Sequence, residues 1–208
     1  MHPTKNIVAL KAQSRTLQVF DLGAKSKLKS HTMNEDVAYW TWFSETSLGL
    51  VTDSAVYHWD VFDATQAAPV KAFERHTNLT GNQIINYRVA EDGKWMVVIG
   101  ISQQQGRVVG AMQLYSKDRG VSQAIEGHAA TFCTFRMEGN STDTKLFAFA
   151  VRGAAGAKLH VIEIDHNAAN PQTFAKKQVE IFFPQEVSRY FDDHVHSADS
   201  PRPVATSL

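Results

Sequence analysis

Three histidines recur at similar intervals and are the first residues of this sequence whose chemistry needs testing. They are His31, His76 and His128, spaced by roughly 45 and roughly 52 residues. Imidazoles can bind metals or transfer protons. None of the three has a second histidine, a cysteine or a carboxylate at ligand spacing, so we expect partly buried rings that bond a neighbouring loop.

Two other groups could carry metal or thiol chemistry. His194-Val195-His196 follows Asp192 and Asp193 and has the residue types of a divalent-metal site, but it stands in a stretch without strand pattern. We predict adventitious binding there at most, and therefore no metal site and no cofactor. The single cysteine, Cys133, lies in an apolar run, which predicts a buried and inert thiol rather than a nucleophile.

Carboxylates give no catalytic pattern either. Glu35, Asp36 and Asp53 stand at expected turns, where we expect them to bond the local backbone. The sequence has no phosphate-cradling glycine loop, no nucleophile elbow and no kinase signature. We assign no catalytic residue and predict that the chain is not an enzyme; a hydrolase is the weakest of the functions considered.

The strands expected around these histidines repeat. Short apolar runs rich in β-formers precede each histidine mark, and turn residues separate them. A period of about 40 to 50 residues with several short strands is typical of propeller blades. We predict an all-β fold, an incomplete seven-bladed β-propeller of about four antiparallel four-stranded blades. The expected units are residues 1–31, 32–76, 77–128 and 129–184, with a divergent, disordered tail at 187–208.

Composition limits the function classes further. The 208 residues are 43% hydrophobic and 20% charged with zero formal net charge, which predicts a globular chain that does not attract nucleic acid. Residues 1–31 are nevertheless basic, with six lysines and arginines against Asp21. A single cysteine and the lack of a signal peptide or long apolar run indicate a cytoplasmic protein without membrane insertion.

Collinear segments of the chain resemble the N-terminal β-propeller of the clathrin heavy chain family. The segments are Ile7–Ala12, Thr16–Phe20, Lys25–Met33, Val51–Trp59, Gln83–Arg88, Gly106–Ser116, Ile125–Ala130 and Phe149–Gly153. The resemblance covers roughly residues 3–186. It implies a non-enzymatic coat component that binds short apolar-acidic motifs of adaptor and accessory proteins. It also implies roles in endocytosis and intracellular protein transport, on coated pits and vesicles of the plasma membrane and trans-Golgi network.

The resemblance implies three peptide-binding surfaces. Matching positions for a clathrin-box groove are Val8, Leu10, Thr16, Gln18, Phe20, Lys25 and Lys27. Matching positions for a tryptophan-motif pocket are Gln83, Ile85 and Ile101. Matching positions for an inter-blade groove are Trp95, Leu114, Arg119, Val121, Gln123 and Ile125, and the residues alone favour core packing for this second and third set.

The chain also departs from the family pattern. The family's first blade, later blades, trimerisation region and light-chain region have no counterpart in the 208 residues, so we expect a fragment or truncated paralogue that is unstable alone. Two alternatives stay open: a stand-alone propeller-like interaction module, or a gene fragment without coat activity.

Overall fold

A computed structural model gives the fold of residues 1–153, 156–164 and 177–181. These residues form strands almost throughout, with one 3-10 helix, η1 (Thr77–Leu79). The predicted all-β fold is confirmed. The expected tail at 187–208 and the His194-Val195-His196 cluster lie outside the described residues.

Within the described ranges, fifteen strands form four antiparallel sheets, each built from consecutive strands. The first sheet contains β1 (Ile7–Ala12), β2 (Thr16–Asp21) and β3 (Ser26–Thr32). The second contains β4 (Tyr39–Trp42), β5 (Ser47–Val51), β6 (Ala55–Asp60) and β7 (Val70–Glu74). The third contains β8 (Gln83–Val89), β9 (Trp95–Gln104), β10 (Arg107–Ser116) and β11 (Val121–Glu126). The fourth contains β12 (Ala129–Phe135), β13 (Thr144–Gly153), β14 (Gly156–Ile164) and β15 (Lys177–Ile181).

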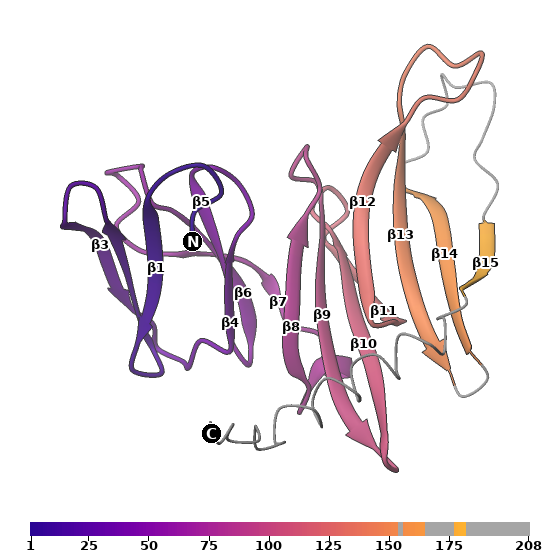
Figure 1. The fold of residues 1–208 in the computed structure, drawn as a ribbon, viewed down its shortest axis with the longest axis horizontal. Coiled ribbons are helices and arrows are strands. Elements are labelled where there is room, and N and C mark those ends of the chain that lie inside the picture. Colours follow the sequence, from indigo (N-terminus) through magenta and orange to yellow (C-terminus); the bar gives the residue numbers. More distant parts are fainter. Residues whose placement is uncertain (154–155, 165–176, 182–208) are drawn as a thin grey trace, which may run out of the picture.

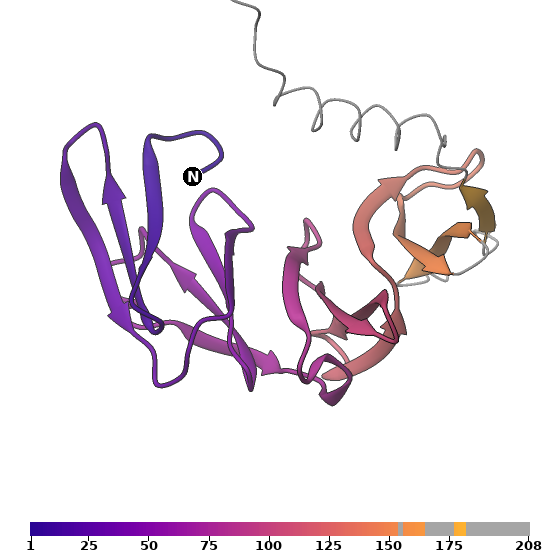
Figure 2. The same ribbon diagram turned by 60° about the horizontal axis from the view of Figure 1, so that its bottom comes forward.

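The four sheets follow one another along an arc. Figure 1 shows the first and second sheets at one end, the third in the middle and the fourth at the other end. The turned view in Figure 2 shows the same order around a curve, so that each sheet lays one face against the next. This is the arrangement of consecutive propeller blades, although the described first sheet has three strands where four were expected.

Three apolar cores lie where successive sheets meet. The first joins Leu17 and Val19 to Leu48, Leu50 and the fully buried Trp59. The second and third cores join the later pairs of sheets in the same way. Strand alternation produces these cores, because every second residue of a strand faces the same side of its sheet.

Two glycines permit close packing where the chain passes from the third sheet to the fourth. A Cβ added to Gly110 would lie 2.2 Å from the carbonyl oxygen of Gly127. A Cβ on Gly127 would lie 2.4 Å from Cε of Met112. The backbone that precedes His128 is therefore packed directly against β10, and no larger residue fits at Gly110, where the close atoms belong to the backbone.

The structure shows one tight hairpin and corrects one local prediction. β9 continues to Gln104, and a two-residue turn leads into β10. Gln105 and Gly106 take φ values of 49° and 76°, which is the left-handed geometry of a two-residue hairpin. Cys133 was expected to be buried, but it is exposed, because β12 is an edge strand from which Phe132 turns towards the core.

Candidate peptide-binding surfaces

The first predicted set lies together on one face of the first sheet. Val8 is paired with Phe20, and Leu10 with Gln18. Thr16 pairs with Thr32, and their hydroxyl oxygens lie 2.9 Å apart. The residues that alternate with this set along β1 and β2 face the second sheet. The side chains of the set therefore point away from the second sheet. We call it the outer face of the first sheet, and no other sheet of the described chain packs on it.

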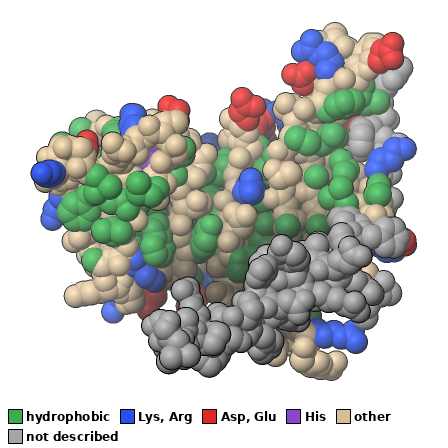
Figure 3. Space-filling model, in the orientation of Figure 1, with side chains coloured by type: hydrophobic (Ala, Val, Ile, Leu, Met, Phe, Trp, Pro, Cys, Tyr) green, Lys and Arg blue, Asp and Glu red, His purple; other side chains and the backbone are tan. Residues whose placement is uncertain are grey.

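The outer face combines apolar groups with a basic edge. Val8 and Phe20 are half-buried, and Leu10 is 48% exposed. Lys27 lies directly opposite Phe20 on β3, and Lys25 precedes that strand. Figure 3 shows hydrophobic side chains gathered over this end of the molecule, with basic side chains at their edge. The arrangement suits an extended ligand with apolar side chains and a carboxylate.

The second predicted set is brought together at one end of the third sheet. Gln83 of β8 pairs directly with Ile101 of β9. Ile85 stands at the bulge in the same pair of strands, and the register shift there turns it towards the third core. Gln83 is exposed, whereas both isoleucines are half-buried, so only part of each isoleucine is open to a ligand.

The third predicted set shares a face of the third sheet, but its centre is closed. Leu114 and Trp95 are 1% and 7% exposed and belong to the core between the third and fourth sheets. Val121 is 50% exposed, and Gln123 is exposed opposite Leu114. The Arg119 guanidinium lies over the Trp95 ring at 5.8 Å. Core packing, which the residues alone favoured, therefore accounts for Trp95 and Leu114, and Ile125 is half-buried beside the same core.

The three recurring histidines are half-buried, as expected, but they differ in their contacts: His31 lies edge-on to the Trp59 ring at 6.1 Å, His76 bonds a local turn, and His128 bonds two strands. His76 caps η1, its Nδ1 accepting from the Asn78 N–H at 3.1 Å. His128 Nδ1 accepts from the Arg152 N–H at 3.2 Å, and Nε2 lies 3.2 Å from the Val108 carbonyl oxygen. These contacts agree with a structural role. Within the described residues no three histidine, cysteine or acidic side chains are grouped to hold a metal ion.

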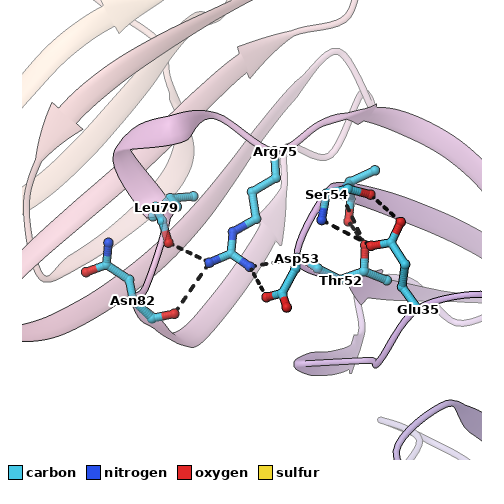
Figure 4. A network of polar contacts seen from close by, with 8 residues as sticks. Glu35, Thr52, Asp53, Ser54, Arg75, Leu79 and Asn82 are labelled. Atoms are coloured by element: carbon cyan, nitrogen blue, oxygen red, sulfur yellow. Dashed lines mark hydrogen bonds and ion pairs between the residues drawn. The ribbon is translucent and has the colours of Figure 1, made fainter.

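Turn carboxylates make longer-range contacts than expected. Glu35 accepts from the hydroxyl of Ser54 at 2.6 Å, and these bonds lower its pKa. Asp53 pairs with Arg75 at 3.1 Å (Figure 4), and Asp36 pairs with Arg15 at 3.4 Å. The expectation of local backbone bonds is wrong for these three, because the fold brings other turns beside them.

Arg75 is the centre of the junction between the second and third sheets. Its side chain is 4% exposed, and it donates to the carbonyl oxygens of Thr52, Leu79 and Asn82 (Figure 4). Gln113, fully buried on β10, accepts from the His76 N–H and donates to the Glu74 carbonyl oxygen. The sequence predicted neither role, because Thr52 lies 23 positions from Arg75 and His76 lies 37 positions from Gln113.

A half-buried histidine contacts a buried tyrosine beside this junction. His58 Nε2 and the Tyr87 hydroxyl oxygen are 2.6 Å apart, and Phe43 stacks near the imidazole at 4.4 Å. Burial, helped by the charge of Lys117, lowers the pKa of His58 to about 4. Burial also raises the pKa of Tyr87. Both side chains are therefore neutral in the fold at neutral pH, which suits packing rather than proton transfer.

Comparison with known proteins shows similarity to clathrin heavy chains along most of this chain. The clathrin propeller repeat model matches residues 80–118. Clathrin heavy chain 2 of Homo sapiens is 53% identical over 92% of this chain, and the clathrin heavy chain of Drosophila melanogaster is 51% identical over 92%. This chain spans only 12% and 11% of the length of those relatives.

One of the solved structures that align with this chain is a WD40 domain. The Neurospora crassa Pan2 WD40 domain aligns with a TM-score of 0.45 at 12% identity, covering 78% of this chain and 47% of that chain. A likeness at this level carries no argument about function. No helix of the described residues is long and apolar enough to cross a membrane.

Proposed function

We propose that this chain serves a clathrin coat as a peptide-binding module, because it is 53% identical to a clathrin heavy chain over 92% of its length and matches the clathrin propeller repeat model at residues 80–118. Its ligands are short motifs of adaptor and accessory proteins, and its place is on coated pits and vesicles in endocytosis and intracellular transport. The role is one of binding, not of catalysis. The observation that supports this proposal best is the outer face of the first sheet.

The outer face offers the contacts that an apolar-acidic motif needs. Leu10 and its neighbours present apolar surface, and an apolar side chain gains about 25 cal/mol for each Å² it buries. Gln18, half-buried between them, carries an amide that can bond a peptide backbone. Lys25 and Lys27 supply positive charge beside that surface. Weak single contacts of this kind gain strength when many copies are held in one lattice.

The second set, Gln83, Ile85 and Ile101, is proposed as a further contact for motifs that contain tryptophan. The third set is proposed as a contact through its exposed residues, Arg119, Val121 and Gln123, because its buried members have no free surface.

A peptide titration tests the first surface. A fluorescent peptide of the form leucine–leucine–acidic–leucine–acidic is titrated onto the whole chain, and its anisotropy is followed. We expect saturable binding that weakens about tenfold or more in the Lys25→Glu, Lys27→Glu double variant, since each factor of ten corresponds to about 1.4 kcal/mol. Gln18→Ala should weaken it as well.

A matched control separates this surface from general charge. Lys158 is exposed on β14 of the fourth sheet, far from the outer face along the arc. Lys158→Glu should leave the peptide affinity unchanged. Equal losses in the control and in the double variant, or no binding by a folded chain, would count against the proposal.

A further inference from the structure

A cleft outside all three predicted sets opens where the third sheet meets the fourth. Its volume is about 470 Å³, and it lies between the turn that joins β8 to β9 and the facing ends of β12, β13 and β14. Its floor is apolar and preformed: Leu146 and Ile164 are each 6% exposed, and Phe132 packs beside Phe147 with ring centroids 5.3 Å apart. Such a floor is suited to one bulky apolar side chain.

The charged residues of the cleft wall carry an excess of negative charge. Asp92 of the third sheet forms an ion pair with Lys145 of the fourth sheet, and both side chains are partly exposed. The Asp92 carboxylate also accepts from the Lys94 N–H at 3.0 Å, and these bonds outweigh burial and lower its pKa. Glu91, exposed on the same wall, adds a second negative charge. With two acids and one lysine, the wall favours a cationic neighbour beside the apolar group.

A second hollow continues from this cleft. It has a volume of about 450 Å³ and runs along β4, β8 and β12. Its charged lining residues, Arg88 and Glu91, balance each other, so the excess of negative charge belongs to the first cleft alone. Glu91 and Phe132 line both hollows, so the two share a wall. A surface of this length fits an extended chain rather than a compact small molecule.

We propose that this cleft binds an extended peptide segment of a partner protein in which a bulky apolar side chain is flanked by lysine or arginine. The inference rests on the proposed peptide-binding function and extends it. The outer face of the first sheet has a basic edge and selects acidic motifs, whereas this cleft has an acidic wall and selects basic ones. One partner carrying both kinds of motif could engage both ends of the arc.

The exposed thiol of Cys133 allows a direct test, because it lines the cleft and is the only cysteine of the chain. The rate of maleimide labelling is measured on the whole chain with acetyl-Gly-Lys-Phe-Lys-Gly-amide as the probe. At about ten times the dissociation constant, mass action predicts labelling about tenfold slower. The same peptide with glutamate in place of both lysines should leave the rate unchanged. Equal protection by both peptides, or none up to about 5 mM, which corresponds to negligible affinity, would overturn the inference.

Two exposed charges provide matched variants. Glu91→Lys should abolish protection by the basic peptide, whereas Glu138→Lys, an exposed acid that is not part of the cleft wall, should retain it. Protection that persists in Glu91→Lys would also overturn the inference. Circular dichroism and thermal melting of each variant verify that the fold is intact.

The proposed function of the outer face and the proposed cleft can be disproved independently of each other. The Lys25→Glu, Lys27→Glu variant should lose the acidic motif but keep the protection of Cys133. If acidic motifs bind the wild-type chain while Cys133 stays unprotected, the cleft inference is wrong and the proposed function stands. Protection of Cys133 without any binding of acidic motifs would instead remove the proposed role of the outer face.

Discussion

The outer face of the first sheet and the face of the third sheet that carries the third predicted set are built alike. They differ in how far their side chains are exposed to solvent. Both present alternating side chains across paired antiparallel strands. On the first sheet Leu10 is 48% exposed, whereas on the third sheet Leu114 is 1% exposed. The fourth sheet covers Leu114, and no described sheet covers Leu10.

The comparison shows that a residue pattern alone does not distinguish a binding surface from a core. Each set contains apolar residues at alternate positions and a basic residue nearby. The position of the next sheet decides which face stays open. This contrast can be tested by perturbing the cores between sheets and the outer face of the first sheet separately.

The largest loss of stability is expected in the core between the third and fourth sheets. Leu114→Ala removes buried methyl groups and leaves a cavity between the third and fourth sheets, which should lower the free energy of unfolding by about 2–5 kcal/mol. Urea denaturation followed by circular dichroism measures the loss. A change under about 0.5 kcal/mol, the size typical of surface substitutions, would show that this seam is not packed as described.

Acid should destabilise the packing between the second and third sheets through His58. The pKa of this imidazole is lowered to about 4 in the fold, so below its ordinary value near 6.5 the unfolded chain binds a proton that the folded chain does not. Stability is therefore complete above about pH 6.5 and is lost progressively down to about pH 4, by about 3 kcal/mol in all.

A non-titrating variant isolates this contribution. His58→Gln lowers stability at neutral pH because it disturbs the contact with Tyr87, but it should flatten the change between about pH 6.5 and about pH 4. Urea midpoints of both proteins across this range provide the measurement. Equal pH dependence in the two proteins would contradict the assignment to His58.

The smallest effect on stability is expected at the open face. Leu10→Ala removes a half-exposed side chain and should cost less than about 1 kcal/mol, since little buried surface is lost. The same change should weaken the acidic peptide of the proposed function. A loss of stability as large as that of Leu114→Ala would mean that the outer face is covered in solution.

Much of the fold could be predicted from the sequence because the signals are local. Alternating aromatic residues such as Trp40 and Trp42 mark strands, and Gly93, with φ of 70°, marks the turn between β8 and β9. The four-sheet order follows from the repeated spacing. The face shared by Val8, Leu10 and Phe20 also follows from alternation once β1 and β2 are paired.

The features that the sequence did not reveal depend on distant partners. Asp92 and Lys145 belong to different sheets, and no local pattern relates them. Exposure of Cys133 depends on where an edge strand stands relative to the neighbouring sheet. Burial of Trp95 and Leu114 likewise required the position of the fourth sheet.

The Arg75 junction has a consequence for the curvature of the arc. The planar guanidinium of Arg75 donates to the carbonyl oxygens of Thr52 and Leu79 at the same time. It therefore resists rotation of the second sheet relative to the third. Between the first and second sheets, by contrast, the polar contacts come from separate side chains: Lys29 donates to the carbonyl oxygens of Asp60 and Asp63, and Trp40 Nε1 donates to that of Ala9. A rotation at the Arg75 junction would have to break several bonds to one rigid group at once, so the second and third sheets are expected to keep a fixed angle to each other.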